Sequence, residues 1–127
     1  MAQRVLIVDD DAPFRQLVRA LLSGIDGLSV VGEAEDGDHA VAVAAALRPD
    51  VVVLDVSMPR MNGIDAAAEI LRARASTRIV FLTATVQEAT IARARNAGLG
   101  PVVVKTTSDL RGELAEALSG LVAQSAW

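Results

Sequence analysis

Short apolar runs alternate along the chain with segments whose apolar residues recur at helical spacing. Five runs have the length and the β-branched content of buried strands, at 4–8, 28–34, 51–54, 79–82 and 101–104. Each is followed by a segment with an apolar or alanine-rich face, which predicts an amphipathic helix. Strand–helix alternation repeated five times favours a parallel sheet with helices on both of its faces.

Capping residues predict where the helices begin and end. Pro13 suits the first turn of a helix, with Asp11 before it as the cap. Asp38 and Ser108 are expected to cap the second and last helices, and Gly98 can end the fourth, over about 86–97, in a left-handed turn. Two inward faces follow from the spacing: Phe14, Leu17, Val18, Leu21 and Leu22 on the first helix, and Ile64, Ala67, Ala68 and Leu71 on the third.

Length and composition limit the classes of protein that fit. A chain of 127 residues suits one domain, with a core over about 4–121 and a tail at 122–127. A net charge of −4 without a basic cluster argues against direct binding of nucleic acid by this segment. Cysteine is absent, which excludes disulfides and thiolate metal sites. Since no run approaches the length of a membrane span, we expect a cytoplasmic protein without a membrane partner.

Polar residues stand at the carboxyl ends of four predicted strands. Asp9 and Asp10 follow the first strand, Asp55 ends the third, Thr83 follows the fourth and Lys105 follows the fifth. Parallel strands bring these ends to one edge of a sheet, where ligands bind in open α/β folds. Three carboxylates held together repel one another unless a cation joins them, and an all-oxygen donor set indicates Mg²⁺.

An ammonium and a hydroxyl beside such an ion would complete a site for a tetrahedral oxyanion. The positive charges can neutralise phosphoryl oxygens, while the hydroxyl donates a hydrogen bond. One of the carboxylates can act as a nucleophile and form an aspartyl phosphate. The residue pattern therefore predicts phosphoryl chemistry at this edge.

Four short motifs carry a resemblance to a known family. They are LIVDD at 6–10, VLDVSMPRMNG at 53–63, LTA at 82–84 and VVK at 103–105, each at the end of a predicted strand. With these motifs the chain resembles the receiver domain of two-component response regulators, from residue 5 to about 121. The resemblance implies an α/β, doubly wound, flavodoxin-like (βα)5 fold with the strand order 2-1-3-4-5.

The same resemblance implies which oxygens act. Asp55 would be the phosphoacceptor, and Asp10 and Asp55 would bind Mg²⁺ directly together with the backbone carbonyl of Ser57. Asp9 would act largely through a metal-bound water. The phosphoryl donor would be a histidine on a partner sensor kinase.

Two further residues would serve the phosphorylated state, and one position departs from the family. Lys105 would pair with Asp55 or its phosphoryl group, and Thr83 would bond a phosphoryl oxygen and move toward it. The family often carries an aromatic residue three positions before the lysine, where this chain has Val102. We therefore expect weaker coupling between the site and the distant face.

The resemblance also implies partners and an output. The domain would catalyse only its own phosphotransfer and dephosphorylation, and would form a homodimer through the fourth and fifth or the first and fifth helices. The sequence resembles those of receivers joined to helix-turn-helix domains of the NarL/LuxR type. The output would therefore be transcription if a DNA-binding domain follows. Two alternatives are a pseudo-receiver that is not phosphorylated, against which the full set of site residues argues, and a phosphatase that uses Asp9 and Asp11.

Overall fold

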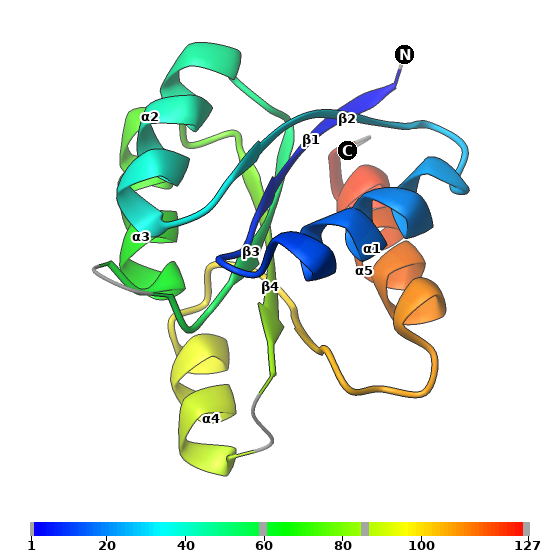
Figure 1. The fold of residues 1–127 in the computed structure, drawn as a ribbon. Helices are drawn as coiled ribbons and strands as arrows, with labels where there is room; N and C mark the ends of the chain where they lie inside the picture. The colour runs from blue at the N-terminus through cyan, green and yellow to red at the C-terminus, as the bar shows by residue number, and fades with distance from the viewer. Residues whose placement is uncertain (1, 59–60, 85–86, 126–127) are drawn as a thin grey trace.

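One parallel sheet forms the centre of the protein, with the strand order β2-β1-β3-β4-β5 (Figure 1). The computed structural model describes residues 2–58, 61–84 and 87–125. This confirms the doubly wound α/β fold and the strand order expected above. The strands are β1 (Gln3–Val8), β2 (Leu28–Ala34), β3 (Val51–Asp55), β4 (Arg78–Thr83) and β5 (Val102–Val104).

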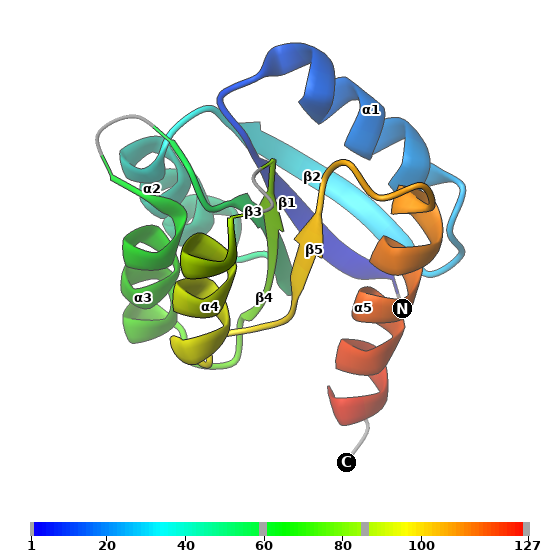
Figure 2. The same cartoon turned by 90° about the horizontal axis from the view of Figure 1, so that it is seen from below.

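Five helices cover the two faces of the sheet. Figure 2 shows α1 and α5 on one face and α2, α3 and α4 on the other. Two hydrophobic clusters match this division, because one joins the sheet to α1 and α5 and the other joins it to α2, α3 and α4. The helices are α1 (Ala12–Ser23), α2 (Gly37–Leu47), α3 (Gly63–Ala73), α4 (Glu88–Asn96) and α5 (Leu110–Ser125).

The central strand β3 is buried along its whole length, as the run of apolar residues at 51–54 predicts. It pairs with β1 on one side and β4 on the other, so that Val53 lies between Ile7 and Val80. Since all the pairs are parallel, the carboxyl ends of β1, β3, β4 and β5 meet at one edge. This arrangement brings the polar residues that follow these strands to the same place.

Two predictions of helix caps need correction. Asp36, and not Asp38, caps α2, because its side chain accepts a hydrogen bond from the backbone N–H of His39 at 2.8 Å. At α5 the carboxylate of Asp109, and not Ser108, accepts from a backbone N–H of the first turn. At α1, Asp11 occupies the cap position as expected, although its side chain makes no cap hydrogen bond. Several polar residues precede each helix, and only the entry angle of the chain decides which one can reach the N–H groups.

The inward faces of two helices also differ from the expected ones. Leu17 of α1 is 47% exposed, although its spacing fits the apolar face. On α3 the fully buried positions are Ala66, Ala67 and Ile70, so the helix is rotated relative to the predicted face. Small alanines let α3 approach the sheet closely, while Ile64 and Leu71 pack at the flanks of the cluster.

Element boundaries agree with the sequence to within two residues at most strands, and Gly98, at φ 68°, takes the left-handed conformation predicted after α4. The helix α5 continues to Ser125, beyond the predicted end of the core near residue 121. The predicted start of the fourth helix at 86, the turn at 59–60 and the last two residues of the tail lie outside the described residues. Across the part that is described, no helix is long and apolar enough to cross a membrane.

Candidate functional site at the carboxyl edge of the sheet

Three carboxylates meet at the edge where β1 and β3 end. One oxygen each from Asp9, Asp10 and Asp55 lies within 4.8 Å of the others. Asp9 and Asp55 are buried, at 1% and 3% exposure, while Asp10 is exposed. The sequence placed these residues together because strand ends share an edge, and the structure confirms that juxtaposition.

Lys105 reaches the carboxylates from the end of β5. Its Nζ lies 2.6 Å from Asp9 Oδ2 and 3.3 Å from Asp55 Oδ2. The lysine backbone N–H donates to the carbonyl of Thr83 at 2.8 Å, which holds the end of β5 against the end of β4. The ammonium therefore bridges the two buried carboxylates, and its shorter contact is with Asp9.

The protonation of this edge follows from its burial. Burial raises the pKa of Asp55 to about 6, an effect that the positive charge of Lys105 opposes and the negative charge of Asp9 increases. Burial alone would lower the pKa of Lys105, but its hydrogen bond to Asp9 and the charge of Asp55 hold that pKa above its ordinary value. At neutral pH the site therefore contains an ionised Asp55 beside a charged lysine.

Backbone contacts position the loop that follows β3. The N–H of Val56 donates to the carbonyl of Leu82 at 2.8 Å, and the N–H of Gly63 donates to the carbonyl of Val56 at 2.8 Å. At Gly63 an added Cβ would lie 2.0 Å from the carbonyl oxygen of Asp55, so a side chain does not fit there. The N–H of Ser57 donates to Asp55 Oδ1 at 3.2 Å, whereas the metal-binding role of the Ser57 carbonyl stays a prediction.

The two residues expected to act as a switch lie on neighbouring strands. Thr83 ends β4 and is buried, at 1% exposure, at the same edge as the carboxylates. Val102 begins β5 and is half-buried against the hydrophobic cluster of the α2, α3 and α4 face. The register pairs Val102 with Phe81 and Val104 with Thr83, so the valine lies two residues away from the site along β5.

Two residues of α1 reach the site, and the sequence analysis did not assign them to it. Lys105 Nζ lies over the ring of Phe14, 4.4 Å from its centroid, within the range of a cation–π contact. Arg15 Nη1 donates to the backbone carbonyl of Asp9 at 2.5 Å. Both residues directly follow the acidic run and lie in the first turns of the helix that Pro13 helps to begin. This position is the signal that could have identified them.

The donor set fits a hard divalent cation. All the candidate ligand atoms are oxygens, and two of the three carboxylates are buried, where their mutual repulsion is poorly screened. A cation at this place would offset that repulsion and favour the ionised form of Asp55. The residues that would offer it oxygen ligands are Asp9, Asp10 and Asp55.

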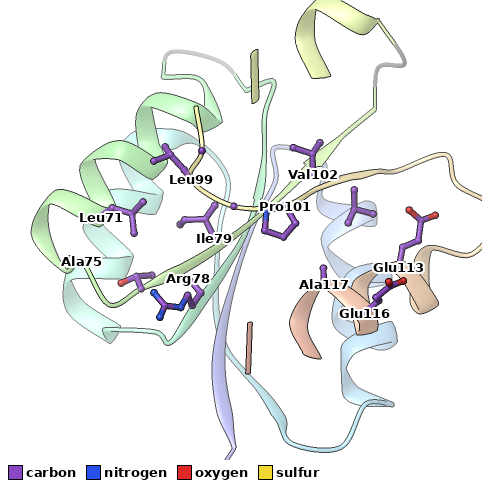
Figure 3. Close-up of a pocket in the computed structure, with 14 residues that line it drawn as sticks. Leu71, Ala75, Arg78, Ile79, Leu99, Pro101, Val102, Glu113, Glu116 and Ala117 are labelled. Atoms are coloured by element: carbon purple, nitrogen blue, oxygen red, sulfur yellow. The ribbon is translucent and has the colours of Figure 1, made fainter. Parts of the chain in front are cut away.

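A separate cavity lies away from the carboxylates. A cavity of about 800 Å³ opens at the amino ends of β4 and β5, at the opposite end of the sheet from the carboxylates (Figure 3). Apolar side chains form most of its wall, Arg78 lies on one side and two glutamates of α5 on the other. The labelled lining residues are Leu71, Ala75, Arg78, Ile79, Leu99, Pro101, Val102, Glu113, Glu116 and Ala117.

Comparison with known proteins gives consistent similarities. The family model described as the response regulator receiver domain matches residues 5–118. The chain is 40% identical over 105 residues to the chemotaxis protein CheY of Thermotoga maritima, covering 83% of this chain and 87% of that protein. It is 45% identical over 106 residues to the transcriptional regulatory protein PdtaR of Mycobacterium tuberculosis, covering 84% of this chain.

Solved structures agree with these sequence matches. A LuxR-family two-component response regulator from Aurantimonas superposes with a TM-score of 0.88 at 30% identity, covering 98% of this chain and 87% of the other. The relatives differ in length, because this chain spans 51% of PdtaR and 30% of a curated methylesterase relative. The similarity therefore concerns one domain that occurs in proteins with different additional parts.

Proposed function

The chain belongs to the response regulator receiver family, and on that premise we propose that it accepts a phosphoryl group on Asp55 from a partner histidine kinase. The observation that carries the proposal is the meeting of Asp9, Asp10, Asp55 and Lys105 at one edge of the sheet. With the family shown, this cluster supports Asp55 as the acceptor because Asp55 ends the central strand and contacts the lysine.

The chemistry follows from the state of Asp55. Its raised pKa of about 6 leaves the carboxylate ionised at neutral pH, with an oxygen available as a nucleophile. That oxygen would attack the phosphorus of a phosphohistidine, so that an O–P bond forms while the N–P bond breaks. The electron pair of the broken bond returns to the histidine ring of the kinase.

The residues around Asp55 would accommodate the added charge. The ammonium of Lys105, now shared between Asp9 and Asp55, can pair with a phosphoryl oxygen, and the hydroxyl of Thr83 can donate to another. The carboxylates of Asp9, Asp10 and Asp55 would hold Mg²⁺ at this edge, and the ion would supply positive charge opposite the phosphoryl oxygens. Asp9 stays within hydrogen-bond distance of the lysine and keeps it at the site.

The output would be a shift between two conformational states. Phosphorylation can change such an equilibrium only if it stabilises one state more than the other. We infer that the change alters self-association or partner binding through α4 and α5 or through α1 and α5. If a DNA-binding domain follows this segment, the change would control transcription in the cytoplasm. PdtaR supports this direction, since its name describes it as a transcriptional regulatory protein.

The acceptor can be tested with a small phosphodonor. Acetyl phosphate and Mg²⁺ are expected to add one acid-stable, base-labile phosphoryl group, detected by intact mass and located at Asp55 by peptide mapping. Asp55→Asn should abolish the adduct, while Asp26→Asn, which changes an exposed turn carboxylate, should leave it unchanged. An adduct of the same yield on Asp55→Asn would refute the assignment and show that another residue is the acceptor, whereas a parent protein that forms no adduct would favour a pseudo-receiver.

A further inference from the structure

Arg15 of α1 joins the acidic edge to the outer strand of the sheet. Its Nη1 donates to the backbone carbonyl of Asp9 at 2.5 Å, and its Nε donates to Glu33 Oε1 at 2.9 Å. The arginine side chain is only 16% exposed, so water competes weakly for either contact. One guanidinium therefore holds the backbone of the acidic run and the edge strand β2 at the same time.

The acidic run has little support from the sheet beyond its first residue. The parallel pairing of β1 with both neighbours ends at Val8. The N–H of Asp9 still reaches the carbonyl of Ala34 at 3.1 Å, and Asp9 Oδ1 accepts from the N–H of Asp11 at 2.9 Å. The carbonyl of Asp9 belongs to the peptide that leads into Asp10, so its direction sets how both carboxylates point.

We propose that Arg15 is a positioning residue for the phosphoacceptor site, which by holding the Asp9 carbonyl orients Asp9 and Asp10 as oxygen ligands for a divalent cation. The inference rests on the proposed function. Repulsion among the three carboxylates pushes the acidic run away from β3 in the absence of a cation. A partly buried, two-point arginine contact resists that movement and keeps the ligand oxygens close together.

Glu33 anchors the arginine and also provides a comparison. Its second oxygen, Oε2, accepts from Arg19 Nε at 2.9 Å, one turn further along α1. Partial burial acts against the charge of Glu33, but the hydrogen bonds from Arg19 and Arg15 hold its pKa below the ordinary value. Arg19 thus makes the same kind of ion pair as Arg15, and its recorded bond goes to Glu33 and not to the acidic run. Arg19→Gln is therefore a matched control for Arg15→Gln.

Amide hydrogen exchange in metal-free protein tests the positioning directly. In Arg15→Gln the amide of Asp11, whose bond to Asp9 depends on the same peptide, should exchange about fivefold faster, as expected for loss of one supporting hydrogen bond. Arg19→Gln should leave this rate unchanged. Urea unfolding should show that both variants lose a similar, small amount of stability, so that a general loosening of α1 cannot account for the difference.

Isothermal titration with Mg²⁺ tests the consequence for the site. The dissociation constant should rise about tenfold in Arg15→Gln, the lower end of the effect seen when a group that orients metal ligands is removed, and Arg19→Gln should match the parent. Arg15→Lys should recover part of the affinity, because one ammonium cannot hold both acceptors with fork geometry.

The two measurements separate this inference from the proposed function. If the parent protein neither binds Mg²⁺ nor forms the adduct on Asp55, the proposed function fails, and the exchange of the Asp11 amide still decides whether Arg15 holds the acidic run. Equal exchange rates, or equal Mg²⁺ affinities in Arg15→Gln and Arg19→Gln alongside normal binding by the parent, would overturn the role of Arg15.

Discussion

Replacing Asp55 with asparagine should make the metal-free protein more stable at neutral pH. The carboxylate is almost fully buried, at 3% exposure, and burial raises its pKa to about 6. Asparagine keeps the shape of the side chain and removes the charge that burial disfavours. Lys105 does not lose its partner, because its shorter contact, at 2.6 Å, is with Asp9.

The size of the effect follows from the change in pKa. A rise from 3.8 to about 6 corresponds to about 3 kcal/mol of difference between the protonated and ionised forms. Because the folded protein holds this proton more tightly than the unfolded chain, the contribution to stability is complete below about pH 4 and is lost as the pH rises through about 6. Relative to Asp55→Asn, the parent should therefore lose about 3 kcal/mol between pH 4 and pH 7, a large part of a typical stability.

Urea unfolding of both proteins in a metal chelator, at several pH values from 4 to 8, measures this difference. The free energy of unfolding of Asp55→Asn minus that of the parent should rise with pH and level off above about pH 7. Asp26→Asn should give a difference that stays flat with pH, and millimolar Mg²⁺ should reduce the Asp55→Asn difference by stabilising the ionised parent. A difference that is flat or that falls as the pH rises would show that burial does not govern Asp55.

Three further predictions concern the surroundings of the site. Gly63→Ala should lower the free energy of unfolding by about 3 kcal/mol in urea melts because its Cβ meets the backbone of Asp55. Gly98→Ala, at φ 68° in open space, should cost only about 1 kcal/mol, and equal costs would contradict the close approach of Gly63 to Asp55. A double-mutant cycle of Phe14→Leu and Lys105→Met should show about 1 kcal/mol of coupling from the cation–π contact, and additive effects would exclude it. Val102→Tyr should enlarge the amide shift changes of α4 on addition of beryllofluoride, since the cavity beside it has room for a ring; unchanged shifts would show that the valine does not limit the coupling.

The sequence predicted the secondary structure well where the signal is local. Each strand is a short β-branched run between turn residues, and β2 was placed with its exact bounds at Leu28–Ala34. The caps of α2 and α5 were misplaced because two residues that can cap a helix lie close together at each start, Asp36 and Asp38 at α2 and Ser108 and Asp109 at α5. At α2, Asp36 is the one with extended backbone, at φ −153° and ψ 175°, and that conformation depends on how β2 ends.

Helix faces were less predictable than helix positions. Leu17 fits the apolar spacing of α1 yet stays 47% exposed, whereas Val18 and Leu22 of the same helix are buried. On α3 the alanines face the sheet because small side chains permit close approach, and this choice depends on the neighbouring helix and strand. Periodicity predicts that a helix has an apolar face, and packing determines which residues of that face are buried.

At the site, the residue types and their positions at the ends of strands are properties of the local sequence. The sequence alone therefore determined that Asp9, Asp55 and Lys105 share one edge. A parallel sheet brings strand ends together whatever the side chains do afterwards. Only the tertiary structure decided that Lys105 lies nearer to Asp9 than to Asp55, and that Phe14 and Arg15 support them. These contacts join residues up to 96 positions apart, and their distances depend on how α1 packs across the sheet, for which spacing along the chain carries no signal.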